Sequence, residues 1–142
     1  IKETVKQLKD AQQTVADLKD DYTVNQLLAE FALSQLKNGG VRATAVRAAG
    51  KSLNEILNAN YTIRDLKNDG VTASEMKAIG KTVSQLESVY SITEIKAANY
   101  TATNIKTALI PLNRARRAYN KNNLIKAGYH MSVGNEDEIT DD

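Results

Sequence analysis

The 142-residue sequence has no cysteine and no tryptophan, and only one phenylalanine, one proline and one histidine. The absence of cysteine excludes disulfides and thiolate metal sites. With one Phe and no Trp, we expect a core built from the Ala, Val, Ile and Leu that make up most of the 42% hydrophobic content. No apolar run approaches the roughly 18 residues of a membrane-spanning helix, so no membrane span is predicted. No signal peptide is recognised, and because the sequence starts at Ile1 rather than Met, we expect a fragment or a processed chain.

A short phrase recurs every nine or ten residues from Thr4 to Tyr129, most clearly in the seven residues 61–67. Thr62 is a good helix N-cap, because its hydroxyl can accept from a free N–H of the first turn. Asp65, three residues later, can accept from the N–H of the cap residue and complete a capping box. Each copy therefore encodes one helix of about two turns.

Thirteen units follow from aligning the chain on this cap position. Successive caps lie ten residues apart, or nine in the units that start at Thr14, Thr23, Thr82 and Pro111. Nine caps are Ser or Thr, and six units have the full Ser/Thr-x-x-Glu/Gln box. The caps are Thr4, Thr14, Thr23, Ala32, Arg42, Ser52, Thr62, Thr72, Thr82, Ser91, Thr101, Pro111 and Asn120.

The fourth residue after the cap is apolar in every unit, and the first is usually apolar as well. This spacing places the apolar residues on one helical face, and no period-two alternation predicts a strand. Helices this short are marginal alone, because isolated helices need roughly 12–15 residues in water. Their apolar stripes must be buried against neighbouring units, so we predict an all-α solenoid over residues 1–129.

A longer period is also present. Residues 32–61 resemble residues 62–90 when one gap is allowed at Asn60; for example, Leu36-Lys37-Asn38 returns as Leu66-Lys67-Asn68. Two interpretations remain open: three helices per superhelical turn, which makes units three apart equivalent, or a duplication of thirty residues without that geometry.

Recurring side chains have a structural and a functional interpretation. A Lys or Arg often follows the apolar residue at the fourth position after the cap. We expect this cation to complement its own helix C-terminus rather than form a ridge that tracks phosphates. We expect the six tyrosines (22, 61, 90, 100, 119 and 129) to act as hydrophobic staples with the hydroxyl at the surface, rather than as stacking platforms for nucleic-acid bases. The glycines at 39, 40, 50, 70, 80 and 128 are interpreted as helix stops.

No residue pattern predicts catalysis, a metal site or a cofactor. The carboxylates three residues after the cap (Asp17, Glu55, Asp65, Glu75 and Glu94) are replaced by Gln or Asn in other units, which capping tolerates and proton transfer does not. His130 has no Cys or acidic cluster around it in sequence, and no phosphate-binding glycine loop is present.

Residues 111–130 carry five cations and no acid, whereas residues 131–142 carry five acids and no cation. We predict an electrostatic contact at the cations and an acidic, disordered tail or linker over residues 130–142. The contact could bind nucleic acid, an acidic protein or the chain's own tail. Its candidate residues are Arg114, Arg116, Arg117, Lys121 and Lys126.

The runs at residues 66–72 (Leu-Lys-Asn-Asp-Gly-Val-Thr) and 124–129 (Leu-Ile-Lys-Ala-Gly-Tyr) resemble a short-helix decapeptide repeat with the consensus Leu-Lys-x-Ala-Gly-Tyr/Phe/Val-Thr. Such solenoids occur in large DNA viruses, algae or protists, and some bacteria. The resemblance covers Thr4 to Tyr129, although the first two units lack the glycine. It implies a structural or adaptor role, with an intracellular or virion location favoured over secretion.

These observations predict a non-enzymatic scaffold or spacer that mediates protein–protein assembly, including a virion or capsid-associated role. The partners would be other proteins or further copies of the chain, associated head to tail. The alternative is a nucleic-acid-binding array that uses the lysines and the Arg114–Arg117 cluster.

Overall fold

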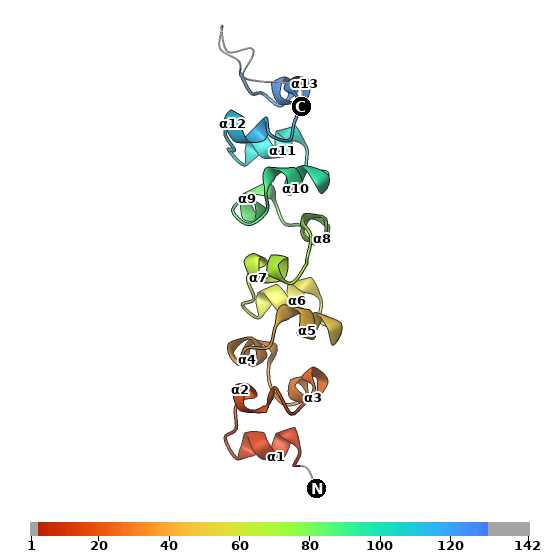
Figure 1. Cartoon of the computed structure of the whole chain (residues 1–142), viewed down its shortest axis with the longest axis vertical. Helices are drawn as coiled ribbons and strands as arrows, with labels where there is room; N and C mark the ends of the chain where they lie inside the picture. Colours follow the sequence, from red (N-terminus) through yellow and green to blue (C-terminus); the bar gives the residue numbers. More distant parts are fainter. Residues whose placement is uncertain (1–2, 131–142) are drawn as a thin grey trace. The chain divides into compact units, whose positions relative to one another are not determined.

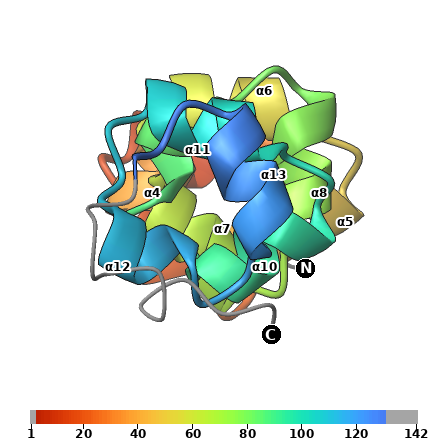
Figure 2. The ribbon, with the colours of Figure 1, turned by 90° about the horizontal axis from the view of Figure 1, so that it is seen from above.

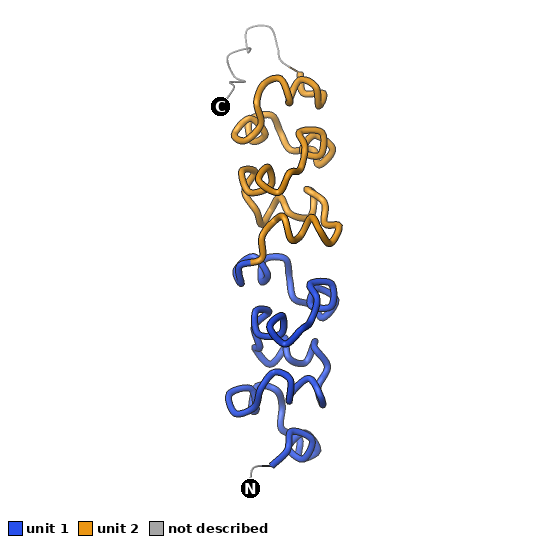
Figure 3. Tube along the Cα trace, turned by 90° about the vertical axis from the view of Figure 1, so that its right-hand side faces the viewer, with its two compact units in different colours: residues 1–70 blue, residues 71–142 orange. Residues whose placement is uncertain are grey.

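A computed structural model describes residues 3–130, which contain thirteen α-helices and no strand. The predicted all-α repeat architecture is confirmed. The chain divides into two compact units, residues 1–70 with α1 to α7 and residues 71–142 with α8 to α13 (Figures 1 and 3). The predicted tail, apart from His130, lies outside the described residues. The helices are α1 (Val5–Asp10), α2 (Val15–Leu18), α3 (Val24–Leu28), α4 (Leu33–Asn38), α5 (Ala43–Ala48), α6 (Leu53–Asn58), α7 (Ile63–Asn68), α8 (Ala73–Ala78), α9 (Val83–Leu86), α10 (Ile92–Ala97), α11 (Ala102–Thr107), α12 (Leu112–Ala115) and α13 (Lys121–Lys126).

The helices begin where the caps predict. In α7 the Thr62 hydroxyl accepts from the Asp65 N–H at 3.0 Å, and the Asp65 carboxylate accepts from the Thr62 N–H at 2.8 Å. The same reciprocal pair is formed in α1, α2, α3, α6, α8, α10 and α11. Each helix has only four to six residues, so it is shorter than the two turns predicted.

The ends of the helices explain the two repeat lengths. In every ten-residue unit, the eighth residue after the cap has a positive φ. These residues are Gln12, Gly40, Gly50, Asn60, Gly70, Gly80, Asn99, Leu109 and Gly128. In most of these units the next N–H bonds to a carbonyl five residues back, as from Val41 to Leu36 at 2.9 Å. Nine-residue units omit the positive-φ residue, and the bond spans four residues, as from Tyr90 to Leu86 at 2.8 Å. In both lengths, therefore, the residue before the next cap bonds in most units to the fourth residue after the cap of its own unit.

The fourth residue after the cap forms the centre of the core. From α3 to α13 its exposed fraction is at most 1%, and Leu18 of α2 is 4% exposed. Leu8 of α1 is half-buried. The residue before the cap is also buried in most units, as at Val41, Tyr61 and Tyr100. The apolar stripe is thus buried between helices, as the sequence predicts.

Helices two apart in the chain pack against each other within each unit. These pairs are α2 with α4 and α5 with α7 in the first unit, and α8 with α10 and α11 with α13 in the second. Seen end-on, α11, α12 and α13 lie at different places around a common centre (Figure 2). Other contacts, described below, join helices three apart. Contacts between helices two apart and three apart are both expected when a spiral has two to three helices per turn. The exact period of three helices stays a prediction.

Gly39 stands at the end of α4, as predicted, but without the left-handed conformation of a glycine stop. Gly39, the C-cap of α4, has φ −81°, a conformation open to any residue. A Cβ at this position would lie 2.6 Å from Cγ1 of Val15 in α2. Gly39 is therefore required for the close approach of α2 and α4, whereas Gly40 (φ 90°) provides the left-handed turn.

Candidate functional site

The tyrosine hydroxyls form a repeated bond that the sequence interpretation missed. Each tyrosine stands directly before a cap position, and its hydroxyl donates to the carbonyl of the equivalent residue two units earlier. Tyr61 reaches Val41 at 2.5 Å and Tyr90 reaches Val71 at 2.6 Å. The other pairs are Tyr22 with Glu3, Tyr100 with Lys81, Tyr119 with Tyr100, and Tyr129 with Ile110. We call this set the tyrosine ladder.

The predicted surface position of the hydroxyls is therefore wrong. Five of the six tyrosines are at most 8% exposed, and only Tyr22 is half-buried. Burial raises the pKa of Tyr61, Tyr90 and Tyr119 to about 12, with nearby carboxylates adding to the effect for the first two. Burial of these five rings between turns of the solenoid leaves them unsuited to stacking on bases.

The recurring lysines also contact other helices. Lys9 of α1 lies 5.3 Å from the ring centroid of Phe31, and its ammonium donates to the Glu30 carbonyl at 2.5 Å, beyond the end of α3. Lys77 of α8 lies equally close to the Tyr100 ring. Lys96 and Lys106 cover the rings of Tyr119 and Tyr129, at 5.8 and 5.0 Å. In each pair the ring stands 22 or 23 residues after the lysine, a little more than two units later. All four lysines also stand in the last turn of their own helices, where the sequence predicts them, so the cation–π contacts add a second role to the predicted one.

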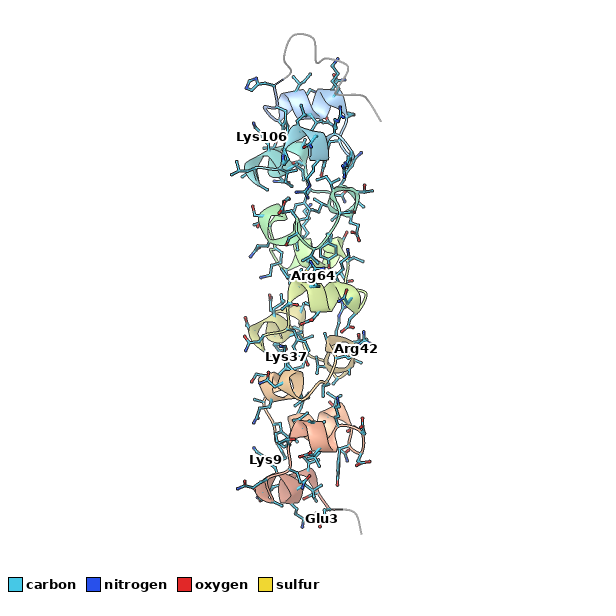
Figure 4. All side chains as sticks on the ribbon, turned by 60° about the vertical axis from the view of Figure 1, so that its left-hand side comes forward. Glu3, Lys9, Lys37, Arg42, Arg64 and Lys106 are labelled. Carbon is cyan, nitrogen blue, oxygen red and sulfur yellow. The ribbon has the colours of Figure 1, made fainter. Side chains whose placement is uncertain are left out.

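A carboxylate from one helix caps another in the first unit. Arg42 occupies the cap position of α5 but makes no capping bond. Asp69, at the end of α7, accepts from the Thr44 N–H at 3.0 Å and from the Arg42 guanidinium at 2.6 Å. The side chain of Asp69 is 6% exposed and that of Arg42 is 72% exposed; Arg42 is labelled in Figure 4. Burial raises the pKa of Asp69, but the hydrogen bonds from Arg42 and Thr44 outweigh it and hold the pKa below 3.8.

The capping role predicted for the third-position carboxylates is confirmed. Asp17, Glu55, Asp65, Glu75 and Glu94 each accept a hydrogen bond from the cap N–H, at 2.8 to 3.2 Å. The bonds from the cap backbone are the main cause that lowers the pKa of Asp17 and Glu55. A carboxylate with a lowered pKa is a poor proton donor or acceptor near neutral pH.

The predicted electrostatic site is divided between two environments. Arg114 donates to the Glu87 carboxylate at 2.8 Å and to the Glu87 carbonyl at 3.3 Å, so it connects α12 with the end of α9. Arg117 and Lys126 are exposed, and Arg116 and Lys121 are half-buried. The five residues come from the α12 and α13 segments, and Arg114 has an internal structural role.

Grooves between helices are a further feature that the sequence patterns did not predict. Four grooves are lined by equivalent residues. Each contains the fifth residue after the cap of one helix and the start of the next helix. The third, sixth and seventh residues after the cap of the helix three further on complete the pattern. They lie between α1, α2 and α4, between α4, α5 and α7, between α8, α9 and α11, and between α10, α11 and α13. Lys9, Lys37, Lys77 and Lys96 respectively supply the first of these positions. Lys9 and Lys37 are labelled in Figure 4.

Other predicted features can be placed directly. His130 is exposed, as expected. Among residues 3–130 no three His, Asp or Glu side chains are grouped as metal ligands would be. None of the helices in the same range has the length and apolar composition needed to cross a membrane.

Regularly spaced short helices that bury one apolar stripe define an all-α repeat solenoid, and this is the class to which the fold belongs. No family model, curated protein or solved structure matches the chain.

Proposed function

We propose that this chain is a non-enzymatic scaffold that mediates protein–protein assembly. The observation that carries the proposal is the use of the recurring polar side chains inside the repeat. Cap residues bond to the third residue after them, tyrosines bond to carbonyls and lysines cover aromatic rings. These positions build the solenoid, and the variable exposed positions between them remain for recognition.

The mechanism of such a scaffold is geometric. Repeat number sets the length of each unit, and the tyrosine ladder recurs in both units with the same register. Surfaces repeated along a solenoid suit partners that contact several turns at once. The resemblance to decapeptide-repeat proteins extends the proposal to a virion or capsid-associated assembly, including head-to-tail association of copies.

Cross-linking mass spectrometry on the native complex that contains the chain tests this proposal. We expect cross-links from exposed lysines such as Lys6 and Lys126 to specific partner proteins or to a second copy. A chain that is monomeric and without partners, and that turns over a small molecule, would contradict the proposal.

A nucleic-acid-binding array is the second candidate, because residues 71–130 carry nine cations and three acids, a net charge of +6. Affinity for a random oligonucleotide, measured across a salt series, distinguishes the two. A protein that tracks phosphates loses affinity steeply as salt increases, whereas a protein-binding scaffold is not retained even at low salt.

A further inference from the structure

The two grooves in the second unit are basic. The groove between α8, α9 and α11 has a volume of about 280 Å³ and includes Lys77 and Lys81. The groove between α10, α11 and α13 has a volume of about 380 Å³ and includes Lys96 and Lys126. The rest of each lining consists of hydroxyl and amide side chains and two apolar side chains, and neither lining contains an Asp or Glu. Each groove therefore has uncompensated positive charge.

One of the two equivalent grooves in the first unit already holds a carboxylate at the seventh position after a cap. Asp69, the seventh residue after the cap of α7, lines the groove between α4, α5 and α7 and bonds there to Arg42 and to the Thr44 N–H. The residues at the same position in the second unit are Ala108 in α11 and Ala127 in α13. Alanine has no carboxylate, so these two grooves lack the acceptor that Asp69 provides in the first unit.

We propose that the two basic grooves of the second unit bind Asp and Glu side chains of an acidic segment in a partner protein. The inference rests on the proposed scaffold function and names the chemistry of the partner. Lys96 and Lys126 provide the charge in one groove, and Lys77 and Lys81 provide it in the other. Hydroxyls and amides that face the same space, such as those of Thr103 and Asn123, supply further hydrogen-bond donors.

Two of the four lysines, one in each groove, are positioned in advance for this task. The Lys96 ammonium lies over the Tyr119 ring at 5.8 Å, and the Lys77 ammonium is held over Tyr100 while it donates to the Asn99 carbonyl at 3.0 Å. Ordering of these side chains reduces the entropy lost when a carboxylate binds. Small grooves that each fit one side chain favour an acidic peptide over a continuous phosphate backbone.

Fluorescence anisotropy with the full chain and a dye-labelled peptide rich in Asp and Glu tests the proposal. We expect binding that disappears when the peptide acids are replaced by Asn and Gln. The double variant K96Q/K126Q should weaken binding by roughly two- to thirtyfold, the range expected for two exposed ion pairs. The matched control R116Q/R117Q removes the same charge from the same unit outside the groove lining, and should leave the affinity within about twofold.

A second variant tests the groove without removing a lysine. Ala127→Asp places a carboxylate at the position equivalent to Asp69, and should compete with the peptide and weaken its binding. Ala127→Asn, which has nearly the same size and no charge, should weaken it less. Circular dichroism of each variant establishes that the fold is retained. If both aspartate and asparagine leave the affinity unchanged, the groove is not the binding site.

Three results would overturn this inference and leave the scaffold proposal standing. An equal loss in K96Q/K126Q and R116Q/R117Q would indicate diffuse electrostatic attraction. Tighter binding of an oligonucleotide of equal charge would assign the grooves to phosphates. A rise of about tenfold on replacing the acids of residues 136–142 by amides would identify the chain's own terminus as the occupant. By contrast, cross-linking without any partner protein would contradict the scaffold function itself.

Discussion

The Tyr61 hydroxyl donates to the Val41 carbonyl across twenty residues of sequence, at 2.5 Å, and both residues are buried. Each stands directly before the cap of its own helix, α7 or α5. The bond is one step of the tyrosine ladder, so it fixes the register between helices two apart in the chain.

Tyr61→Phe removes this bond and leaves a buried carbonyl without its donor. We expect the variant to lose about 1–3 kcal/mol of unfolding free energy, measured by chemical denaturation. Tyr22→Phe is the matched control in the same unit. Because Tyr22 is half-buried, water can reach the Glu3 carbonyl, and the loss should be smaller. Equal losses in the two variants would contradict the role assigned to burial.

Phe31→Tyr should stabilise the first unit. Phe31 occupies a ladder position without a hydroxyl, and the equivalent carbonyl two units earlier belongs to Gln13. Both residues line the same groove of about 670 Å³, which has room for one more oxygen. We expect a gain of about 0.5–1.5 kcal/mol, the usual net value of a hydrogen bond, in the same denaturation assay. A loss of stability would show that the ladder register does not extend to this position.

Asp69→Asn should destabilise the first unit by about 1–3 kcal/mol at neutral pH, because it weakens the charged bonds to Arg42 and Thr44. Arg42→Gln should cost less than about 1 kcal/mol, since Arg42 is largely exposed. Equal costs would mean that the ion pair, and not the capping of Thr44, stabilises α5.

The contribution of Asp69 should also depend on pH. Its pKa is lower in the folded chain than the ordinary value of 3.8. A lowered pKa means that the stability is present above the unfolded-state value and is lost as pH falls through the folded-state value. The difference in unfolding free energy between the wild type and Asp69→Asn should therefore be constant near neutrality and shrink below pH 3.8. A difference that does not change with acid would contradict this assignment.

Alkaline pH should weaken the ladder. Tyr61, Tyr90 and Tyr119 have pKa values of about 12 when folded, against 10.0 for a free tyrosine. The folded chain therefore holds its phenolic protons more tightly, and its stability should be full below pH 10 and decrease as pH rises toward 12. Ultraviolet titration of tyrosinate should show a delayed fraction that moves to the ordinary pKa in denaturant. A single transition at the ordinary pKa in the folded chain would contradict burial of these hydroxyls.

Gly39→Ala and Gly50→Ala separate the two roles of glycine. A methyl group at Gly39 would meet the Val15 side chain at 2.6 Å, and this clash should cost about 1–3 kcal/mol. At Gly50 no atom lies within 4 Å, but φ is 100°, so only backbone strain of about 1–2 kcal/mol is expected. Gly50→Asn should lose less unfolding free energy than Gly50→Ala, because Asn tolerates positive φ. By contrast, Gly39→Asn should be at least as destabilising as Gly39→Ala.

Features whose partners lie within one repeat follow directly from the amino-acid sequence. Thr62 and Asp65 are three residues apart, so their reciprocal bonds could be predicted from spacing alone. Burial of the fourth residue, such as Leu66, follows from the same helical periodicity. The all-α solenoid follows in turn, because helices this short must share a core.

Which turns of the solenoid contact each other depends on long-range packing. The acceptor of Tyr61, the cap that Asp69 provides to α5 and the approach of Gly39 to Val15 all join residues twenty or more positions apart. Their pairing depends on how far the chain rotates from one helix to the next, and that rotation is set by packing that local spacing does not encode. The basic grooves arise from the same rotation, which brings Lys96 and Lys126 from separate helices to one opening.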